Sequence, residues 1–261
     1  MKAFGAVVQA LREHAGLSRE EFALQVGYSR HTVASVEPGR RMPDRDLVDR
    51  AEAATGNTGA LRRSAQHLSR QPGLAAWFRQ WARMEQQAVS LYTYECRLVP
   101  GLLQTAAYAR TLFVNQLPPL GDEQIEAQLQ ARLGRQRLLR ERPNTAYSFI
   151  LEEQVFVRRT GGTKVTRELI DHILDLAELR NIEVQLMPQV RESHAGLAGP
   201  MQLLESPDNR WFAYIEGQKT GQLISDRKEV STLQMRFARM RSQALTLEDS
   251  LGLLRRMRGA L

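Results

Sequence analysis

The sequence contains a single cysteine, few lysines and no long hydrophobic run. The one cysteine, Cys96, excludes an intramolecular disulfide and fits a reducing compartment. No apolar stretch approaches the length of a membrane-spanning helix. The first residues, MKAFGAVVQALREHAG, are too few and too charged for a signal peptide. We therefore expect a cytoplasmic protein that does not associate with a membrane.

Patterns typical of catalysis or metal binding are also scarce. Three histidines, His67, His172 and His194, lack the spacing of metal ligands, and Cys96 has no histidine close to it in sequence. Glu152 and Glu153 follow a predicted strand and could act as an acid and a base. Such a pair is also typical of a helix N-terminus, where the helix dipole favours carboxylates. We predict that the protein is not an enzyme and uses no metal or cofactor.

Lysine is rare among the cations, since only four of the 36 basic residues are lysine. Arginine suits bidentate contacts with phosphate or carboxylate, although a GC-rich genome would produce the same bias. The formal net charge of +7 lies at the two ends of the chain: residues 1–70 carry +3, residues 71–225 are neutral and residues 226–261 carry +4. A modestly positive N-terminal region favours weak, salt-sensitive attraction to a polyanion.

The length of 261 residues, with 43% apolar side chains, suits two domains. Pro72 and Gly73 follow a polar helical stretch and mark a joint between them. We place a helical domain over residues 1–72 and an α+β domain over residues 73–261.

The N-terminal domain is predicted to be a bundle of four or five short helices. In the first helix, Phe4, Val7, Val8 and Leu11 form one apolar stripe, and Gly16 ends the helix. A further helix begins near residue 44, after the segment considered next.

Residues 18–37 carry the signals of a helix-turn-helix. Ser18 and Glu21 form a capping box at the start of the second helix. Gly27 supplies the positive φ of a tight turn, and Ser29 caps a third helix over residues 29–37. A short helix held from behind in this way can enter the major groove of DNA.

The outward side chains of this third helix are the candidates for reading bases. We predict base contacts from Arg30, His31, Thr32 and Ser35. Arginine can donate two hydrogen bonds to guanine, and a hydroxyl group can serve several bases. We predict DNA phosphate contacts from Arg19, Ser29, Arg40 and Arg41. The alternative is a helical hairpin with a solvated, charged face.

The second domain mixes helices and strands. Its order lacks the regular βαβ alternation of a doubly wound sheet and predicts a small, mostly antiparallel sheet. The predicted strands are SLYTYECRLV, AYSFILE, NIEVQLMP, GPMQLLES, WFAYIE and GQLISD. The predicted helices cover residues 75–89, 105–114, 122–142, 165–179, 227–244 and 247–257.

Five arginines, Arg132, Arg135, Arg137, Arg140 and Arg142, lie on two faces of the helix predicted over residues 122–142. A solvated face is the simple interpretation. The functional alternative is a surface that binds an acidic protein partner or the DNA backbone.

The segment LREHAGLSREEFALQVGYSRHTVASVEPGRRMP resembles the phage-repressor-type (Xre/Cro) helix-turn-helix family. The matching features are Leu11–Arg12, Leu17–Ser18, Ala23, Gly27, Ser29, Glu37, Gly39 and Pro43. Pro38 departs from the family pattern and removes one backbone donor that could meet a phosphate.

Residues from about 75 to 255 resemble the C-terminal domain of WhiJ-like, antitoxin-like bacterial regulators, on the phrases YECRLVPGLLQTAAYAR, ARLGRQRLL and FILEEQVFVRRTGG. The resemblance implies a transcriptional regulator, and we expect a dimeric repressor that reads the major groove of double-stranded DNA with helix 29–37. Its second domain would mediate dimerisation and sense a small molecule or a protein. The alternative is an antitoxin-like protein that binds a small partner encoded nearby and autoregulates its operon.

Overall fold

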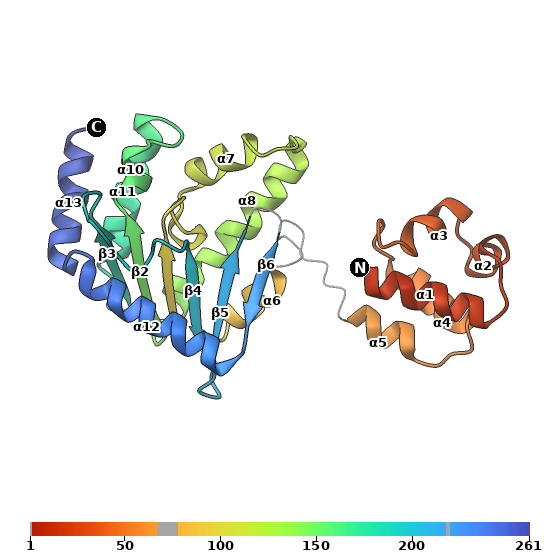
Figure 1. Cartoon of the computed structure of the whole chain (residues 1–261). Coiled ribbons are helices and arrows are strands. Elements are labelled where there is room, and N and C mark those ends of the chain that lie inside the picture. The colour runs from red at the N-terminus through yellow and green to blue at the C-terminus, as the bar shows by residue number, and fades with distance from the viewer. Residues whose placement is uncertain (1, 67–77, 218–219) are drawn as a thin grey trace. The chain divides into compact units, whose positions relative to one another are not determined.

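The computed structural model describes residues 2–66, 78–217 and 220–261 (Figure 1). The chain divides into two compact units, Met1–Arg70 and Gln71–Leu261, which we call the helical unit and the sheet unit. The boundary predicted at residue 72 lies outside the described residues.

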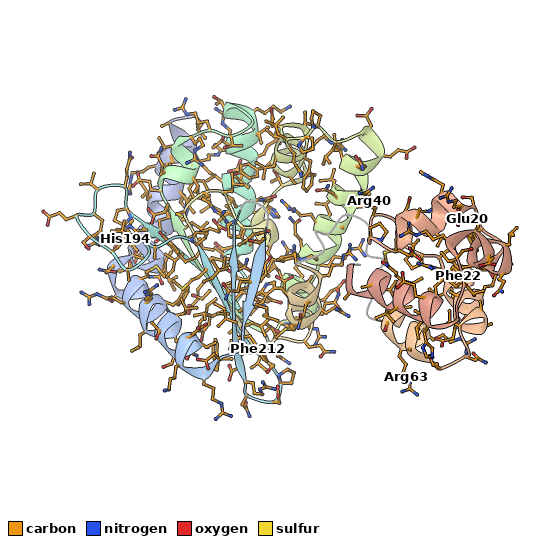
Figure 2. The ribbon with its side chains drawn as sticks, turned by 45° about the vertical axis from the view of Figure 1, so that its right-hand side comes forward. Glu20, Phe22, Arg40, Arg63, His194 and Phe212 are labelled. Atoms are coloured by element: carbon orange, nitrogen blue, oxygen red, sulfur yellow. The ribbon has the colours of Figure 1, made fainter. Side chains whose placement is uncertain are left out.

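The helical unit has five helices in its described part, as the sequence predicts. They are α1 (Lys2–His14), α2 (Arg19–Val26), α3 (Arg30–Val36), α4 (Arg45–Ala54) and α5 (Ala60–Gln66). Apolar side chains from all five helices form one core, in which Phe22 and Val26 are almost fully buried (Figure 2).

Local signals set the helix ends in this unit. The Ser18 hydroxyl accepts a hydrogen bond from the Glu21 backbone N–H at 3.2 Å, and the Glu21 carboxylate accepts one from the Ser18 N–H at 2.8 Å. The predicted capping box is therefore confirmed. Gly27 has a φ of 70° at the end of α2, which is the left-handed conformation that the predicted turn requires.

The sheet unit contains all six predicted strands. They are β1 (Ser90–Glu95), β2 (Ala146–Glu152), β3 (Ile182–Met187), β4 (Met201–Glu205), β5 (Trp211–Glu216) and β6 (Gly221–Ile224). The helices are α6 (Arg79–Glu85), α7 (Ala106–Val114), α8 (Asp122–Gln136), α9 (Leu138–Glu141), α10 (Gln154–Val157), α11 (Thr163–Leu176), α12 (Arg227–Gln243) and α13 (Leu247–Gly259), with a 3-10 turn at Gly101–Leu103.

The sheet is mixed, in the order β3-β2-β1-β4-β5-β6. The strands β1, β2 and β3 are parallel. On the other side of β1, β4 pairs with β1, β5 with β4 and β6 with β5, and each of these pairs is antiparallel. The α+β class is confirmed, and antiparallel pairs outnumber parallel ones. The sequence did not predict the parallel half, in which helical connections link β1 to β2 and β2 to β3, as parallel pairing requires.

The two faces of the sheet pack against different helices (Figure 1). Side chains on one face, including Leu91 and Phe149, form a core with α6, α11 and α13. The other face, including Ile150 and Leu203, packs against Phe237 of α12. Successive side chains of a strand point to opposite faces, so the two cores share the same strands.

The helix predicted over residues 122–142 is interrupted at Arg137, between α8 and α9. Side chains from other elements bond to the backbone there: the Tyr147 hydroxyl donates to the Leu138 carbonyl and the Asn181 amide donates to the Leu139 carbonyl. Among the described helices, none is both long and apolar enough to cross a bilayer.

Candidate nucleic-acid interface and a polar cavity

The N-terminal end of α3 is fixed by short-range bonds. The Ser29 hydroxyl accepts a hydrogen bond from the Thr32 N–H at 3.1 Å, as the predicted cap requires. In the turn before it, the Tyr28 hydroxyl donates to Asp44 at 2.7 Å, which ties the turn to the start of α4. This hydrogen bond raises the pKa of Tyr28 to about 12.

The C-terminal end of α3 is held by a buried carboxylate. Glu37 accepts hydrogen bonds from Arg12 Nε and Arg19 Nε, each at 2.6 Å, and its side chain is 0% exposed. At Gly5 of α1, an added Cβ would lie 2.1 Å from the Glu37 carbonyl oxygen. Because only glycine allows this approach, α1 packs directly against the backbone at the end of α3. Both ends of α3 are therefore fixed to the rest of the unit.

The outer side of α3 presents Arg30 and His31, which are exposed, and Ser35, which is half-buried. Arg30 Nε lies 2.6 Å from a carboxylate oxygen of Glu20 on α2. Both side chains are more than half exposed, and an exposed pair of this kind contributes about 0–1 kcal/mol. A bidentate contact with guanine discriminates by about 1–3 kcal/mol, so Arg30 can leave Glu20 for a base.

The expectation that Thr32 points outward is wrong. Thr32 is 6% exposed, and its hydroxyl lies 3.0 Å from the Ser29 hydroxyl and accepts a hydrogen bond from Arg41 Nη1 at 3.1 Å. In the first turn of α3, the Thr32 hydroxyl thus lies next to Ser29, the N-cap residue. Thr32 therefore supports α3 from inside the unit.

The side chains predicted to contact phosphates lie around α3. Ser29, Arg40 and Arg41 are exposed, and Arg41 is also the donor to Thr32. Arg19 keeps 43% of its side chain exposed while its Nε binds Glu37. Its hydrogen bond with Glu37 raises the pKa of Arg19, so it remains a cation.

Sequence reasoning missed the acidic residues that position these cations. Glu37 was noted as part of a family pattern, and its position next to the proline after a short helix gave no sign of two arginine partners. Glu20 lies on the neighbouring helix and faces Arg30, which follows from how α2 and α3 pack.

In the sheet unit, the carboxylate pair Glu152 and Glu153 has structural partners. Glu152 accepts a hydrogen bond from the Tyr94 hydroxyl at 2.7 Å and lies 3.6 Å from His194 Nε2. Glu153 precedes α10, as the helix-terminus interpretation predicts, and accepts from the Gln189 N–H. Among the described residues, no cluster of three or more His, Cys, Asp or Glu side chains could hold a metal ion.

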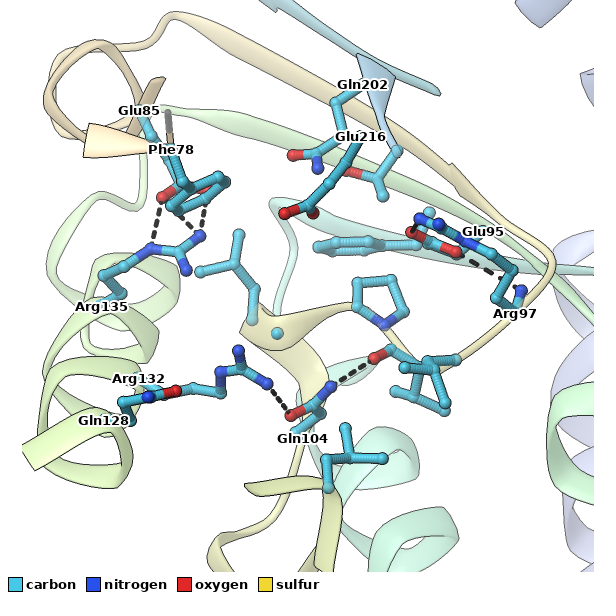
Figure 3. Close-up of a pocket in the computed structure, with 18 of the residues that line it drawn as sticks. Phe78, Glu85, Glu95, Arg97, Gln104, Gln128, Arg132, Arg135, Gln202 and Glu216 are labelled. Carbon is cyan, nitrogen blue, oxygen red and sulfur yellow. Dashed lines mark hydrogen bonds and ion pairs between the residues drawn. The ribbon is translucent and has the colours of Figure 1, made fainter. Parts of the chain in front are cut away.

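A cavity of about 340 Å³ lies within the sheet unit, between α8 and the ends of the central strands (Figure 3). Arg132 and Arg135 of α8 form one wall. Glu95 at the end of β1 and Glu216 at the end of β5 lie across from them. Glu85 stands beside Arg135, and Arg97 stands beside Glu95 (Figure 3). The wall formed by α8 therefore carries a net positive charge, and the opposite wall carries a net negative charge.

The structure separates the five arginines of the helix predicted over residues 122–142. Arg132 and Arg135 line the cavity, whereas Arg137, Arg140 and Arg142 are exposed. The solvated-face interpretation is therefore wrong for the first two. The exposure of the other three fits both a solvated face and a surface that binds an acidic partner or the DNA backbone.

Comparisons with known protein families divide the chain at the same place. Residues 3–65 match a helix-turn-helix domain, and residues 78–256 match a domain of unknown function, DUF5753. No curated protein and no solved structure matches the chain. The helix-turn-helix match extends from α1 into α5 and supports DNA as a partner. Since the second match spans more than half of the sequence, the chain belongs to the DUF5753 domain family, here behind a helix-turn-helix domain.

Proposed function

We propose that this protein is a sequence-specific transcriptional regulator of the Xre/Cro type that reads the major groove with α3. The observation that carries the proposal is that α3 is fixed at both ends while Arg30 and His31 remain exposed. A rigidly held helix with free outer side chains is what major-groove reading needs. Arg19, Arg40 and Arg41 around it would neutralise phosphates.

A dimer is the physical expectation for this mode of binding. One short reading helix contacts too few base pairs for operator affinity, and two copies on half-sites one helical turn apart double the contact. We assign dimerisation and sensing of a ligand or protein to the sheet unit. Repression by occupying an operator in the cytoplasm is the simplest way for such a protein to act.

We propose no catalytic role for the sheet unit. Its carboxylate and histidine cluster is bonded internally: Glu152 binds Tyr94, and His194 Nδ1 accepts from the Gly196 N–H. An antitoxin-like role with a small partner stays a prediction, and copurification of a stoichiometric complex would decide it.

Replacing Arg30 tests the proposal. Duplexes selected by the full-length protein from random DNA are compared with an unselected duplex by fluorescence anisotropy at one salt concentration. Arg30→Ala should lose about 1–3 kcal/mol on the selected duplex and much less on the unselected one, because only a base contact depends on sequence.

Arg63→Ala is the matched control. Arg63 is exposed on α5 and points away from the helical unit (Figure 2). Its replacement changes the net charge by the same amount as the replacement of Arg30. The ratio of the two affinities should stay at the wild-type value. Equal losses on both duplexes in Arg30→Ala, or no duplex preferred by the wild type, would contradict the proposal.

A further inference from the structure

Arg132 is a cation in the cavity wall whose partners are incomplete. Its Nη1 donates to the Gln104 side-chain oxygen at 2.6 Å, and its guanidinium lies 4.6 Å from the centre of the Phe113 ring. Within the residues that the structure describes, no carboxylate pairs with Arg132. Burial, together with the neighbouring Arg135, lowers the pKa of Arg132 to about 10, so it is still charged at neutral pH.

Arg135, one helical turn away, shows what a complete set of partners looks like. Its Nε and Nη2 donate to the two carboxylate oxygens of Glu85 at 2.8 and 3.0 Å, and it stacks 4.4 Å from the centre of the Phe78 ring. Because Arg135 is neutralised, the free positive charge of this wall belongs to Arg132, which points into the cavity (Figure 3). Arg132 is half-buried, and Glu216 attracts it without forming an ion pair. A desolvated charge without a paired carboxylate is unfavourable, and an anionic group of a ligand would reduce that penalty.

Gln104 holds Arg132 in place for such a ligand. The Gln104 amide donates to the Val99 carbonyl at 2.6 Å, and its oxygen is thereby turned towards Arg132. Gln104 is 2% exposed, so its orientation does not depend on solvent. The guanidinium is therefore aimed before any ligand arrives.

The opposite wall has the reverse charge. Glu95 keeps only 14% of its side chain exposed and has one exposed ion-pair partner, Arg97, at 3.4 Å. Burial raises the pKa of Glu95 against the effect of Arg97, and Glu216 raises it further. The negative charge of Glu216 near Glu95 favours a cation close to both carboxylates.

We propose that this cavity binds a zwitterionic small molecule, with its acidic group on Arg132 and its basic group between Glu95 and Glu216. The class includes amino acids and short peptides. The cavity volume of about 340 Å³ lies within the usual range for small-molecule sites. The cavity lies beside the carboxyl end of β1, which has β2 on one side and β4 on the other. The chain continues from β1 to β2, and α/β sheets commonly bind ligands at such a point.

The inference deepens the proposed function, because it gives the sensing role of the sheet unit a ligand class. Its test needs no DNA, so its failure would leave the DNA-binding proposal intact, and the reverse also holds. All three tryptophans, at positions 77, 81 and 211, belong to the sheet unit. Thermal unfolding followed by tryptophan fluorescence therefore reports on the unit that contains the cavity.

The probes are the proteinogenic amino acids and a set of dipeptides, added singly to the full-length protein. For each compound that raises the melting temperature, calorimetry compares it with its analogue lacking the carboxylate and its analogue lacking the amine. At least one zwitterion should stabilise the protein, and each analogue should bind roughly tenfold or more weakly.

Two substitutions assign the charges to the walls. The Arg132→Gln protein should bind the zwitterion no more tightly than it binds the analogue that lacks the carboxylate. The Glu216→Gln protein should bind the zwitterion no more tightly than it binds the analogue that lacks the amine. The control substitutions Arg137→Gln and Glu178→Gln remove exposed charges from the same unit and should keep wild-type binding.

The inference would be overturned if no zwitterion stabilises the wild-type protein, or if the analogue that lacks the amine binds as tightly as the zwitterion. It would also be overturned if the cavity substitutions and the control substitutions weaken binding equally. If Arg132→Gln fails to fold, Glu216→Gln and the two analogues on the wild-type protein still decide the outcome.

Discussion

Each unit contains an arginine that points inward, and the two units partner it in opposite ways. In the helical unit, Arg12 is 8% exposed and shares the carboxylate of Glu37 with Arg19. In the sheet unit, Arg132 faces a cavity, and its direct partners among the described residues are an amide and an aromatic ring. The first arrangement is closed and makes a surface rigid, whereas the second leaves a charge that a ligand can neutralise.

The difference indicates where each unit meets its partner. The helical unit uses its internal ion pairs to hold α3, and its exposed cations are left for phosphates and bases. The sheet unit places Arg132, Glu95 and Glu216 inside a cavity, where a small molecule can reach them and a DNA backbone cannot. The surface proposed to bind a polyanion and the site proposed to bind a small ligand thus use the same residue types at different depths.

The largest effect on stability is expected from breaking the ion-pair network of Arg12, Arg19 and Glu37. Glu37→Gln should destabilise the helical unit by about 3–5 kcal/mol, because Arg12 stays buried without its carboxylate. Hydrogen exchange followed by mass spectrometry should show faster exchange in α1 to α3, while the fluorescence melt of the sheet unit stays at the wild-type temperature.

Glu85→Gln is the matched substitution in the other unit, because Glu85 is 1% exposed and pairs with Arg135. It should lower the fluorescence melting temperature and leave exchange in α1 to α3 unchanged. If either substitution destabilises both units equally, the two ion-pair networks do not act separately.

The contrast also explains what the sequence could predict. Caps, the turn glycine and apolar stripes are local signals, so five helices and six strands were located correctly. Thr32 was misplaced because α3 has only seven residues, and its hydroxyl bonds back to the cap instead of following the outer face. The cavity could not be predicted, because its walls come from strand ends that meet only once the strand order is known.

A smaller effect is expected at the phosphate-facing rim of the helical unit. Arg41→Ala should weaken binding to selected and unselected duplexes alike and reduce the slope of log affinity against log salt by about 1. A titration of both duplexes over a series of salt concentrations measures this slope. An unchanged slope would mean that Arg41 serves only to bond Thr32 and does not neutralise a phosphate.

The smallest effect is expected where the two kinds of charge meet on the surface, at the pair of Glu20 and Arg30. Glu20→Gln should strengthen DNA binding by less than about 1 kcal/mol, because the pair is exposed and its opening costs little. Asp49→Asn is the control, since Asp49 forms a similarly exposed pair with Arg62 on α4 and α5 and its loss changes the net charge equally. A gain that exceeds the control and disappears in the Arg30→Ala background would show that Glu20 holds Arg30 away from DNA until a base competes for it. A gain equal to that of the control would mean that only the net charge affects DNA binding. Glu20 would then not compete with DNA for Arg30, and the helical unit would lack this difference from the cavity, where no carboxylate among the described residues pairs with Arg132.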